Sequence, residues 1–95
     1  MRVRREEVVD VYVEDGRAAV YSNRGMVVLL SELATTAWSV IGDDGWTNAD
    51  DVTAALVAAH GDPGGGEAGR LTEDALESLA EMSLVEIEDS ELTMP

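Results

Sequence analysis

The residues that could carry catalytic chemistry are few in this 95-residue chain. It contains a single histidine, His60, and it has neither cysteine nor lysine. Acid–base or nucleophilic catalysis would therefore fall on Asp, Glu, Ser, Thr and Tyr alone. Because His60 stands near the end of a predicted helix, its ring suits the negative end of the helix dipole, and the sequence offers it no catalytic or metal-binding partners.

Two pairs of carboxylates and one glycine-rich run are the remaining candidates for chemistry. Asp43-Asp44 and Asp50-Asp51 could indicate a divalent cation, but neither pair has the spacing of a calcium-binding loop. Residues 62–69 lack the pattern of a phosphate-binding loop and follow a predicted helix instead of a strand. We therefore expect no enzymatic activity, no cofactor and no metal site.

The composition restricts the classes of partner. The formal net charge is −14, from 20 acidic and 6 basic residues. Nucleic-acid binding needs Lys and Arg to neutralise phosphates, so we expect no nucleic-acid partner. The charged start of the chain does not look like a signal peptide, and no apolar run reaches the length of a membrane span. The sequence predicts a cytoplasmic protein with no membrane association.

Two strands joined by a tight turn are predicted near the N-terminus. Residues 8–14 alternate, with Val9, Val11 and Val13 expected to face the core. Asp15-Gly16 is typical of a two-residue hairpin turn. Residues 17–22 return as the second strand, with Ala18 and Val20 expected in the core.

A third strand is predicted at residues 26–30, which are all apolar. Side chains alternate between the faces of a strand, so an apolar run of this kind needs cover on both sides. Its free edge carries neither charge nor proline, the usual protection of an edge strand. Two interpretations stay open: a helix, the tail or a second subunit covers this strand, or an extended peptide adds to it as a fourth strand.

Three helices and a short last strand follow. Ser31, Asn48 and Thr72 are the expected N-caps, and Leu71 and Leu76 are expected to form a hydrophobic staple. Trp38 is expected in the core, and residues 84–88 could add a strand. We predict one α+β domain over 1–95 of the winged helix-turn-helix type, with a three-stranded antiparallel sheet followed by three helices. Its core spans about 8–87, with a flexible loop at 62–69 and a mobile acidic tail at 88–95.

The order and spacing of these segments resemble the PqqD-like family (PQQ-synthesis protein D), which supplies recognition elements for ribosomally made, post-translationally modified peptides. The resemblance covers about residues 8–87. Ser31 stands where the family usually has Asn, Ser83 replaces a usual Gly, and the glycine-rich loop is longer. The matching segments are Val27 to Glu32, Ala34 to Trp38, Gly42 to Thr47, Ala49 to Leu56 and Leu79 to Val85.

The resemblance implies a peptide chaperone in natural product biosynthesis. The leader segment of a precursor peptide would add as a strand in a groove between the third strand and the third helix. A separate modifying enzyme, such as a radical-SAM protein or a leader peptidase, would then act on the bound peptide. The implied groove residues are Met26, Val27, Val28, Leu29 and Leu30 on the strand and Leu71, Ala75, Ser78, Leu79 and Met82 on the helix, with Arg24 and Arg70 as partners of acidic leader residues.

Two other functions remain as alternatives. The helical half of the predicted fold also suits a winged-helix DNA-binding regulator, against which the charge and the absence of lysine argue. The chain could also be a structural or dimerisation subunit of a biosynthetic complex, because a free strand edge serves a homodimer as well as a peptide.

Overall fold

The computed structural model describes residues 1–42 and 45–88 of the chain. The acidic pair at 43–44 and most of the predicted acidic tail lie outside the described residues. The elements are β1 (Arg2–Arg5), β2 (Val8–Glu14), β3 (Arg17–Ser22), β4 (Val27–Leu29), α1 (Glu32–Val40), β5 (Thr47–Asn48), α2 (Ala49–His60), α3 (Ala68–Glu81) and β6 (Val85–Glu88).

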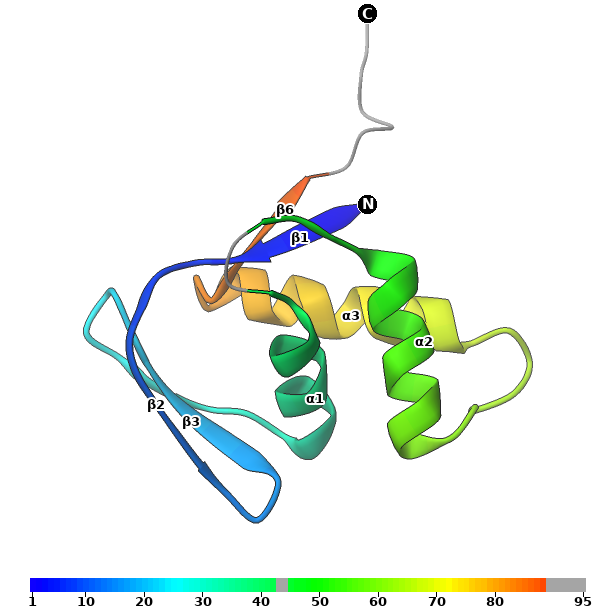
Figure 1. Ribbon diagram of the computed structural model, residues 1–95, viewed down its shortest axis with the longest axis horizontal. Helices are drawn as coiled ribbons and strands as arrows, with labels where there is room; N and C mark the ends of the chain where they lie inside the picture. The colour runs from blue at the N-terminus through cyan, green and yellow to red at the C-terminus, as the bar shows by residue number, and fades with distance from the viewer. Residues whose placement is uncertain (43–44, 89–95) are drawn as a thin grey trace, which may run out of the picture.

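The described chain is an α+β fold with two three-stranded antiparallel sheets and three helices (Figure 1). One sheet has the order β2-β3-β4, and the other has the order β5-β1-β6. The α+β class is therefore confirmed. The predicted order of three strands followed by three helices is wrong, because β1 precedes the first predicted strand and β5 interrupts the helices.

The β2-β3-β4 sheet forms where the sequence predicts a meander. The β2–β3 turn places Asp15 at φ 55° and Gly16 at φ 77°, the left-handed pair that matches the twist of a two-residue hairpin. In register, Val11 faces Val20, and Val20 faces Val28 on the next strand. The third predicted strand is shorter than expected and spans Val27–Leu29.

The inward face of β2 was only partly predicted. The pairing of β2 with β3 shifts between Val8 and Asp10, so Val9 leaves the alternation and is 64% exposed. Val13 lies opposite buried Ala18, yet it is 58% exposed because the hairpin extends beyond the helices (Figure 1). Ala18 and Val20 are buried as expected.

The β5-β1-β6 sheet depends on contacts between the two ends of the described chain. Arg2 is paired with Glu88 and Arg4 with Glu86, and both guanidinium groups lie 4.7 Å from the ring centre of Trp46. The hydrogen bond from Arg2, assisted by the nearby arginine charges, lowers the pKa of Glu88 below its ordinary carboxyl value. The sequence analysis assigned no element to residues 2–5, whereas the expected strand at 84–88 is confirmed as β6.

The first two helices begin at the predicted caps. The Ser31 hydroxyl accepts the amide of Ala34, and the Asn48 side chain accepts the amide of Asp50. Gly61 ends α2 with φ 91°, a backbone conformation that favours glycine. These local signals were sufficient because each cap is satisfied within its own turn.

The third helix begins five residues before the predicted position. Glu67 is its N-cap and Ala68 its first residue, so Thr72 lies inside the helix and the predicted staple is wrong. Thr72 is buried, and its hydroxyl donates to the carbonyl of Ala68. Because that hydroxyl bonds within the helix, a typical capping residue is accommodated in a helical turn. The linker between α2 and α3 therefore ends before residue 68.

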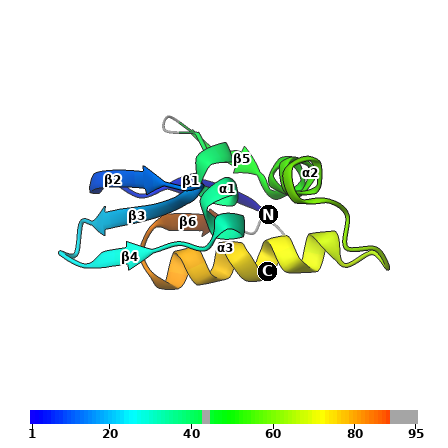
Figure 2. The same cartoon turned by 90° about the horizontal axis from the view of Figure 1, so that it is seen from below.

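The core lies where the β2-β3-β4 sheet, the helices and the β1–β6 pair meet (Figure 2). Trp38 is buried as predicted, beneath the guanidinium of Arg5 at 3.9 Å from its ring centre. The largest fully buried apolar side chains are Val3, Val20, Leu30, Ile41, Val52, Leu76, Leu79 and Leu84.

Candidate functional site

The backbone of β4 presents unused hydrogen-bonding groups on one side. The Leu30 amide donates to Ala18 at 2.8 Å, and the Met26 carbonyl accepts the Ser22 amide at 2.8 Å. Backbone groups alternate in direction along a strand, so the groups of positions 26, 28 and 30 point to β3. The amides and carbonyls of Val27 and Leu29 therefore point away from the sheet. Among the described strands, none pairs with that side of β4.

The side chains of β4 divide between a buried and an exposed face. Val28 and Leu30 are buried, whereas Val27 is 67% exposed and Leu29 is 75% exposed. The apolar run at residues 26–30 predicted cover on both faces of this strand. Within the described part of the chain only the inner face has cover, so the apolar run at 26–30 remains half open to solvent.

The exposed face of β4 continues across the sheet as an apolar surface. Leu29 pairs with Ala19, which pairs with Tyr12, and Val27 pairs with Tyr21. Both tyrosines are exposed. An added strand beside β4 would place alternate side chains next to this surface.

One outward amide on the opposite edge of the same sheet is occupied by a side chain. On β2 the amide of Val11 lies outside the hydrogen-bonded pairs of the hairpin and donates to the carboxylate of Asp10 at 2.8 Å. Charged side chains that occupy edge groups discourage pairing with another chain. A side chain thus competes for an outward amide on β2, whereas no side chain is bonded to the outward amides of Val27 and Leu29 among the described residues.

The β3–β4 turn fixes the start of the open edge. The buried hydroxyl of Ser22 accepts the amides of Arg24 at 3.2 Å and of Met26 at 3.3 Å. Gly25 has φ 82°, which the turn requires. The Arg24 side chain is exposed, and no ion pair to its guanidinium is found among the described residues. A cation is therefore available at this end of β4.

The predicted helix residues are only partly brought to the edge. In Figure 2, β4 lies at the level of α3, whereas β2 lies farther from this helix. Ser78 is exposed, Ala75 and Met82 are half-buried, and Leu79 is fully buried in the core. Leu79 belongs to the same buried cluster as Val28 and Leu30, so its side chain is not accessible to a bound strand. Leu71 lies near the other end of the helix, away from these residues.

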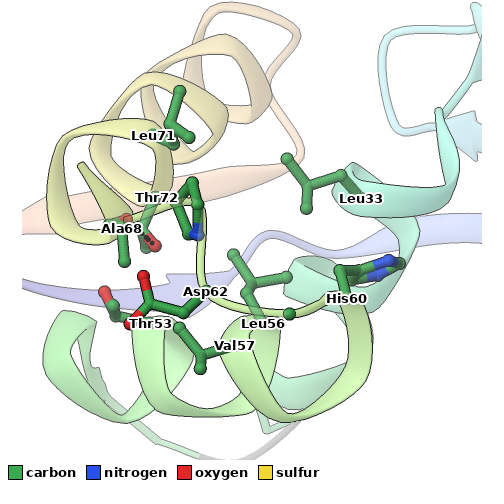
Figure 3. Close-up of a pocket in the computed structure, with 11 residues that line it drawn as sticks. Leu33, Thr53, Leu56, Val57, His60, Asp62, Ala68, Leu71 and Thr72 are labelled. Carbon is green, nitrogen blue, oxygen red and sulfur yellow. Dashed lines mark hydrogen bonds between the residues drawn. The ribbon is translucent and has the colours of Figure 1, made fainter. Parts of the chain in front are cut away.

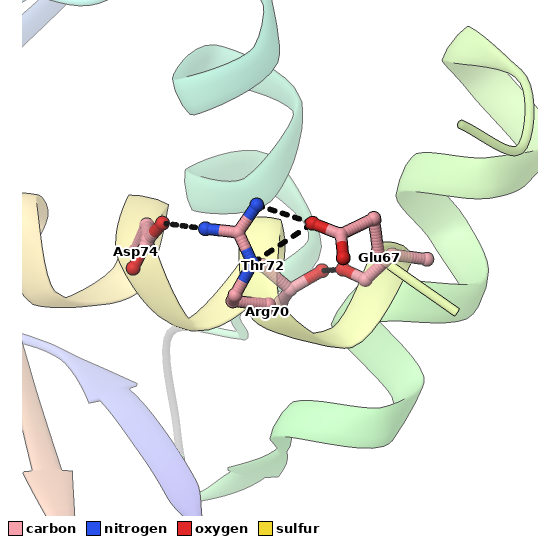
Figure 4. Close-up of polar contacts among 5 residues, drawn as sticks. Glu67, Arg70, Thr72 and Asp74 are labelled. Atoms are coloured by element: carbon pink, nitrogen blue, oxygen red, sulfur yellow. Dashed lines mark hydrogen bonds and ion pairs between the residues drawn. The ribbon is translucent and has the colours of Figure 1, made fainter. Parts of the chain in front are cut away.

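Arg70 is engaged within its own helix. Its guanidinium is paired with Glu67, the N-cap, and with Asp74 at 3.4 Å (Figure 4). These are exposed pairs at i,i+3 and i,i+4 spacing and contribute little to stability. An acidic peptide residue would nevertheless have to compete with two carboxylates for this cation. Arg24 is the better placed of the two predicted arginines.

A pocket at the junction of the three helices was not predicted as a site. It has a volume of about 270 Å³, and its lining includes Leu33 of α1, Leu56 and Val57 of α2, and Leu71 of α3 (Figure 3). Apolar spacing in the helical segments that contain Leu33 and Leu56 does not show that the helices leave a space between them. Helical spacing reveals which residues face inward, but not how completely the facing helices fill the interface.

The described residues contain no group of three His, Asp or Glu side chains that could hold a metal ion. His60 is engaged through Nε2 with the hydroxyl of Thr36 at 2.8 Å, which joins the end of α2 to α1. Among the described helices, none is long and apolar enough to cross a membrane. The open edge of β4 is the candidate site because its outward backbone groups have no strand partner among the described residues and its outer side chains are apolar and exposed. Its chemistry is main-chain hydrogen bonding beside apolar side chains.

Comparisons of the chain with protein families, with curated proteins and with solved structures find no match in any of the three.

Proposed function

We propose that this chain is a peptide-recognition module that binds an extended peptide along the open edge of β4. The outward amides and carbonyls of Val27 and Leu29 carry the proposal, because they are the main-chain groups that an added strand needs. Exposed apolar side chains on the same strand supply contact area. The Val11 amide on β2, which is occupied by the Asp10 carboxylate, supports the choice of β4 over the other side of the sheet.

The peptide is a leader segment of a ribosomally made precursor, as the resemblance to the PqqD-like family implies. In this proposal, the β2-β3-β4 sheet and the three helices correspond to the winged helix-turn-helix unit of that family. The module has no catalytic activity and presents the peptide to a separate modifying enzyme. Tethering the substrate in this way raises its effective concentration at the active site of that enzyme.

The register of β4 defines a sharp binding test. Val27 is the first residue of an edge strand, and its amide points away from β3, so proline is tolerated there. Val27→Pro removes one donor of the proposed ladder, whereas Val27→Ala keeps the donor and removes only side-chain contacts. The two variants therefore separate main-chain recognition from apolar contact.

Synthetic leader peptides from precursor genes next to this gene are titrated against both variants by fluorescence anisotropy. We expect Val27→Pro to weaken binding about 10- to 100-fold, because the peptide acceptor loses its partner, and Val27→Ala to weaken it less. Amide shifts of the unmodified protein should be largest at positions 27 and 29. If no leader binds more tightly than about 100 μM, a value typical of weak association, the proposal is wrong.

A second copy of the chain could occupy the same edge by antiparallel pairing. Sedimentation of the free protein distinguishes this outcome, because edge pairing would give a dimer that dissociates when peptide is added. A stable dimer that excludes every leader peptide would contradict the peptide-binding proposal and favour the dimerisation subunit.

A further inference from the structure

We infer that the pocket at the junction of the three helices accepts one apolar side chain of the same peptide, from the segment that passes the C-terminal end of β4. This inference rests on the proposed function, and it adds a specificity-determining contact outside the added strand. Four observations carry it: the size of the pocket, the state of its polar groups, the exposure of its rim, and its position relative to β4.

The volume suits one side chain. Pockets that hold whole drug-sized ligands or cofactors span about 300–1,000 Å³, and this one is smaller, at about 270 Å³. An apolar cavity of about 150 Å³ already accepts benzene. A leucine, methionine or phenylalanine side chain therefore fits in this volume.

Most polar side chains of the lining already have a hydrogen-bond partner inside the protein. The hydroxyls of Thr53 and Thr72 donate to carbonyls of their own helices, Ala49 and Ala68. The remaining polar side chains of the lining are His60, which is bonded to Thr36, and Asp62, which accepts the amide of Gly64. The two threonine hydroxyls therefore offer little to a polar guest, which would lose its hydration, and the leucine and valine side chains of the lining favour an apolar group. The second oxygen of the exposed Asp62 carboxylate is the polar exception.

The rim is open, and on the side of α1 and α3 it is apolar. Leu71 is 38% exposed on α3, and Leu33 is half-buried on α1, and the two face the same space (Figure 3). An exposed leucine beside a half-buried one loses further apolar surface when a guest side chain enters between them. The pocket is thus completed by a guest, and its entrance lies between α1 and α3.

The pocket is within reach of a peptide bound at β4. Leu33 follows Leu29 by four residues, so their Cα atoms are at most about 14 Å apart, the length of four fully extended residues. A peptide that pairs with Leu29 needs only about four or five further residues to cover that span. The expected recognition element is therefore an extended apolar segment followed, after a short interval, by a single bulky apolar anchor.

The test uses a leader peptide that binds the unmodified protein. Ala68 lines the pocket at the start of α3, so Ala68→Phe fills the space from within. Ala59→Phe is the matched control, because Ala59 is exposed on α2 and is not part of the lining. We expect Ala68→Phe to weaken binding about 10- to 100-fold and Ala59→Phe to leave it unchanged.

The peptide supplies the reciprocal measurement. Serine replaces each apolar residue outside the strand-pairing segment in turn, and one replacement should weaken binding by a similar factor in the unmodified protein but add nothing in Ala68→Phe. Should Ala68→Phe fail to fold by circular dichroism, Leu71→Ser at the exposed rim replaces it in the same cycle. Normal binding to the pocket variant, with Val27→Pro still blocking the peptide, overturns this inference and leaves the proposed function intact. Absence of binding by every leader overturns both.

Discussion

At the scale of single residues, two buried hydroxyls hold the β2-β3-β4 sheet in the form that opens the edge of β4. Ser22 secures the turn that leads into β4. Thr35 on α1 accepts the amide of Ala18 at 2.9 Å, a group of β3 that would otherwise lie unpaired in the core. A buried amide without a partner is costly, so Thr35 joins the helix to the sheet through a bond that no apolar residue can replace.

Replacement of Thr35 by valine tests this joint. Thr35→Val keeps the shape of the side chain but leaves the Ala18 amide unsatisfied, and we expect it to lower the free energy of unfolding by about 1–3 kcal/mol. Urea unfolding followed by circular dichroism measures the change. Thr53→Val is the control, because the Thr53 hydroxyl donates only to a helix carbonyl; its effect should stay within about 0.5 kcal/mol. Equal losses in the two variants would show that the bond to Ala18 contributes nothing special.

At the scale of elements, β4 performs two separate tasks with alternate residues. The backbone groups of Val28 face β3 and its side chain is buried, so this position maintains the sheet. The backbone groups of Val27 and Leu29 point away from β3, and their side chains are exposed on the outer face of the sheet. A three-residue strand can therefore keep its place in the fold while offering an intact edge to a partner.

Because adjacent residues of β4 direct their amides to opposite sides, proline should affect the free energy of unfolding very differently at positions 27 and 28. Val28→Pro removes an amide that faces β3 and puts a strained ring in the core, so we expect a loss of about 2 kcal/mol or more in unfolding free energy. Val27→Pro should change that free energy by less than about 1 kcal/mol, because its amide has no partner in the sheet. Parallel urea melts decide the point. If the two melts were reversed, the hydrogen-bonding directions derived for β4 would be wrong.

At the scale of the whole molecule, the charge argues against the DNA-binding alternative. The chain carries a net charge of −14 and no lysine. Of its arginines, Arg2, Arg4 and Arg70 are paired with carboxylates. The described surface therefore lacks the concentration of free cations from which a phosphate-binding face is made.

We expect no measurable affinity for duplex DNA. Non-specific binding is driven by release of counterions from phosphates, and an acidic protein of this kind gains nothing from it. Anisotropy of a labelled duplex should stay flat on titration at about 50 mM salt, where DNA-binding proteins bind strongly. Saturable binding that weakens steeply with added salt would contradict this expectation and support the alternative function of a DNA-binding regulator.

The sequence by itself determined those features whose physical cause lies within a few neighbouring residues. The hairpin at Asp15-Gly16 and the caps at Ser31 and Asn48 are satisfied inside a single turn, so their residue types were sufficient to place them. The apolar run at 26–30 likewise indicated a strand with an unusual second face. That face proved to be exposed in the described structure.

Only the tertiary structure decided the features that depend on distant partners. Residues 2–5 become a strand because residues 85–88, at the other end of the described chain, pair with them along the backbone, and Val3 and Val85 are buried. Thr72 lies inside a helix, since burial among the helices outweighed its preference for a cap. The direction of each β4 amide and the pocket between the helices follow from register and packing, which no single segment of the sequence encodes.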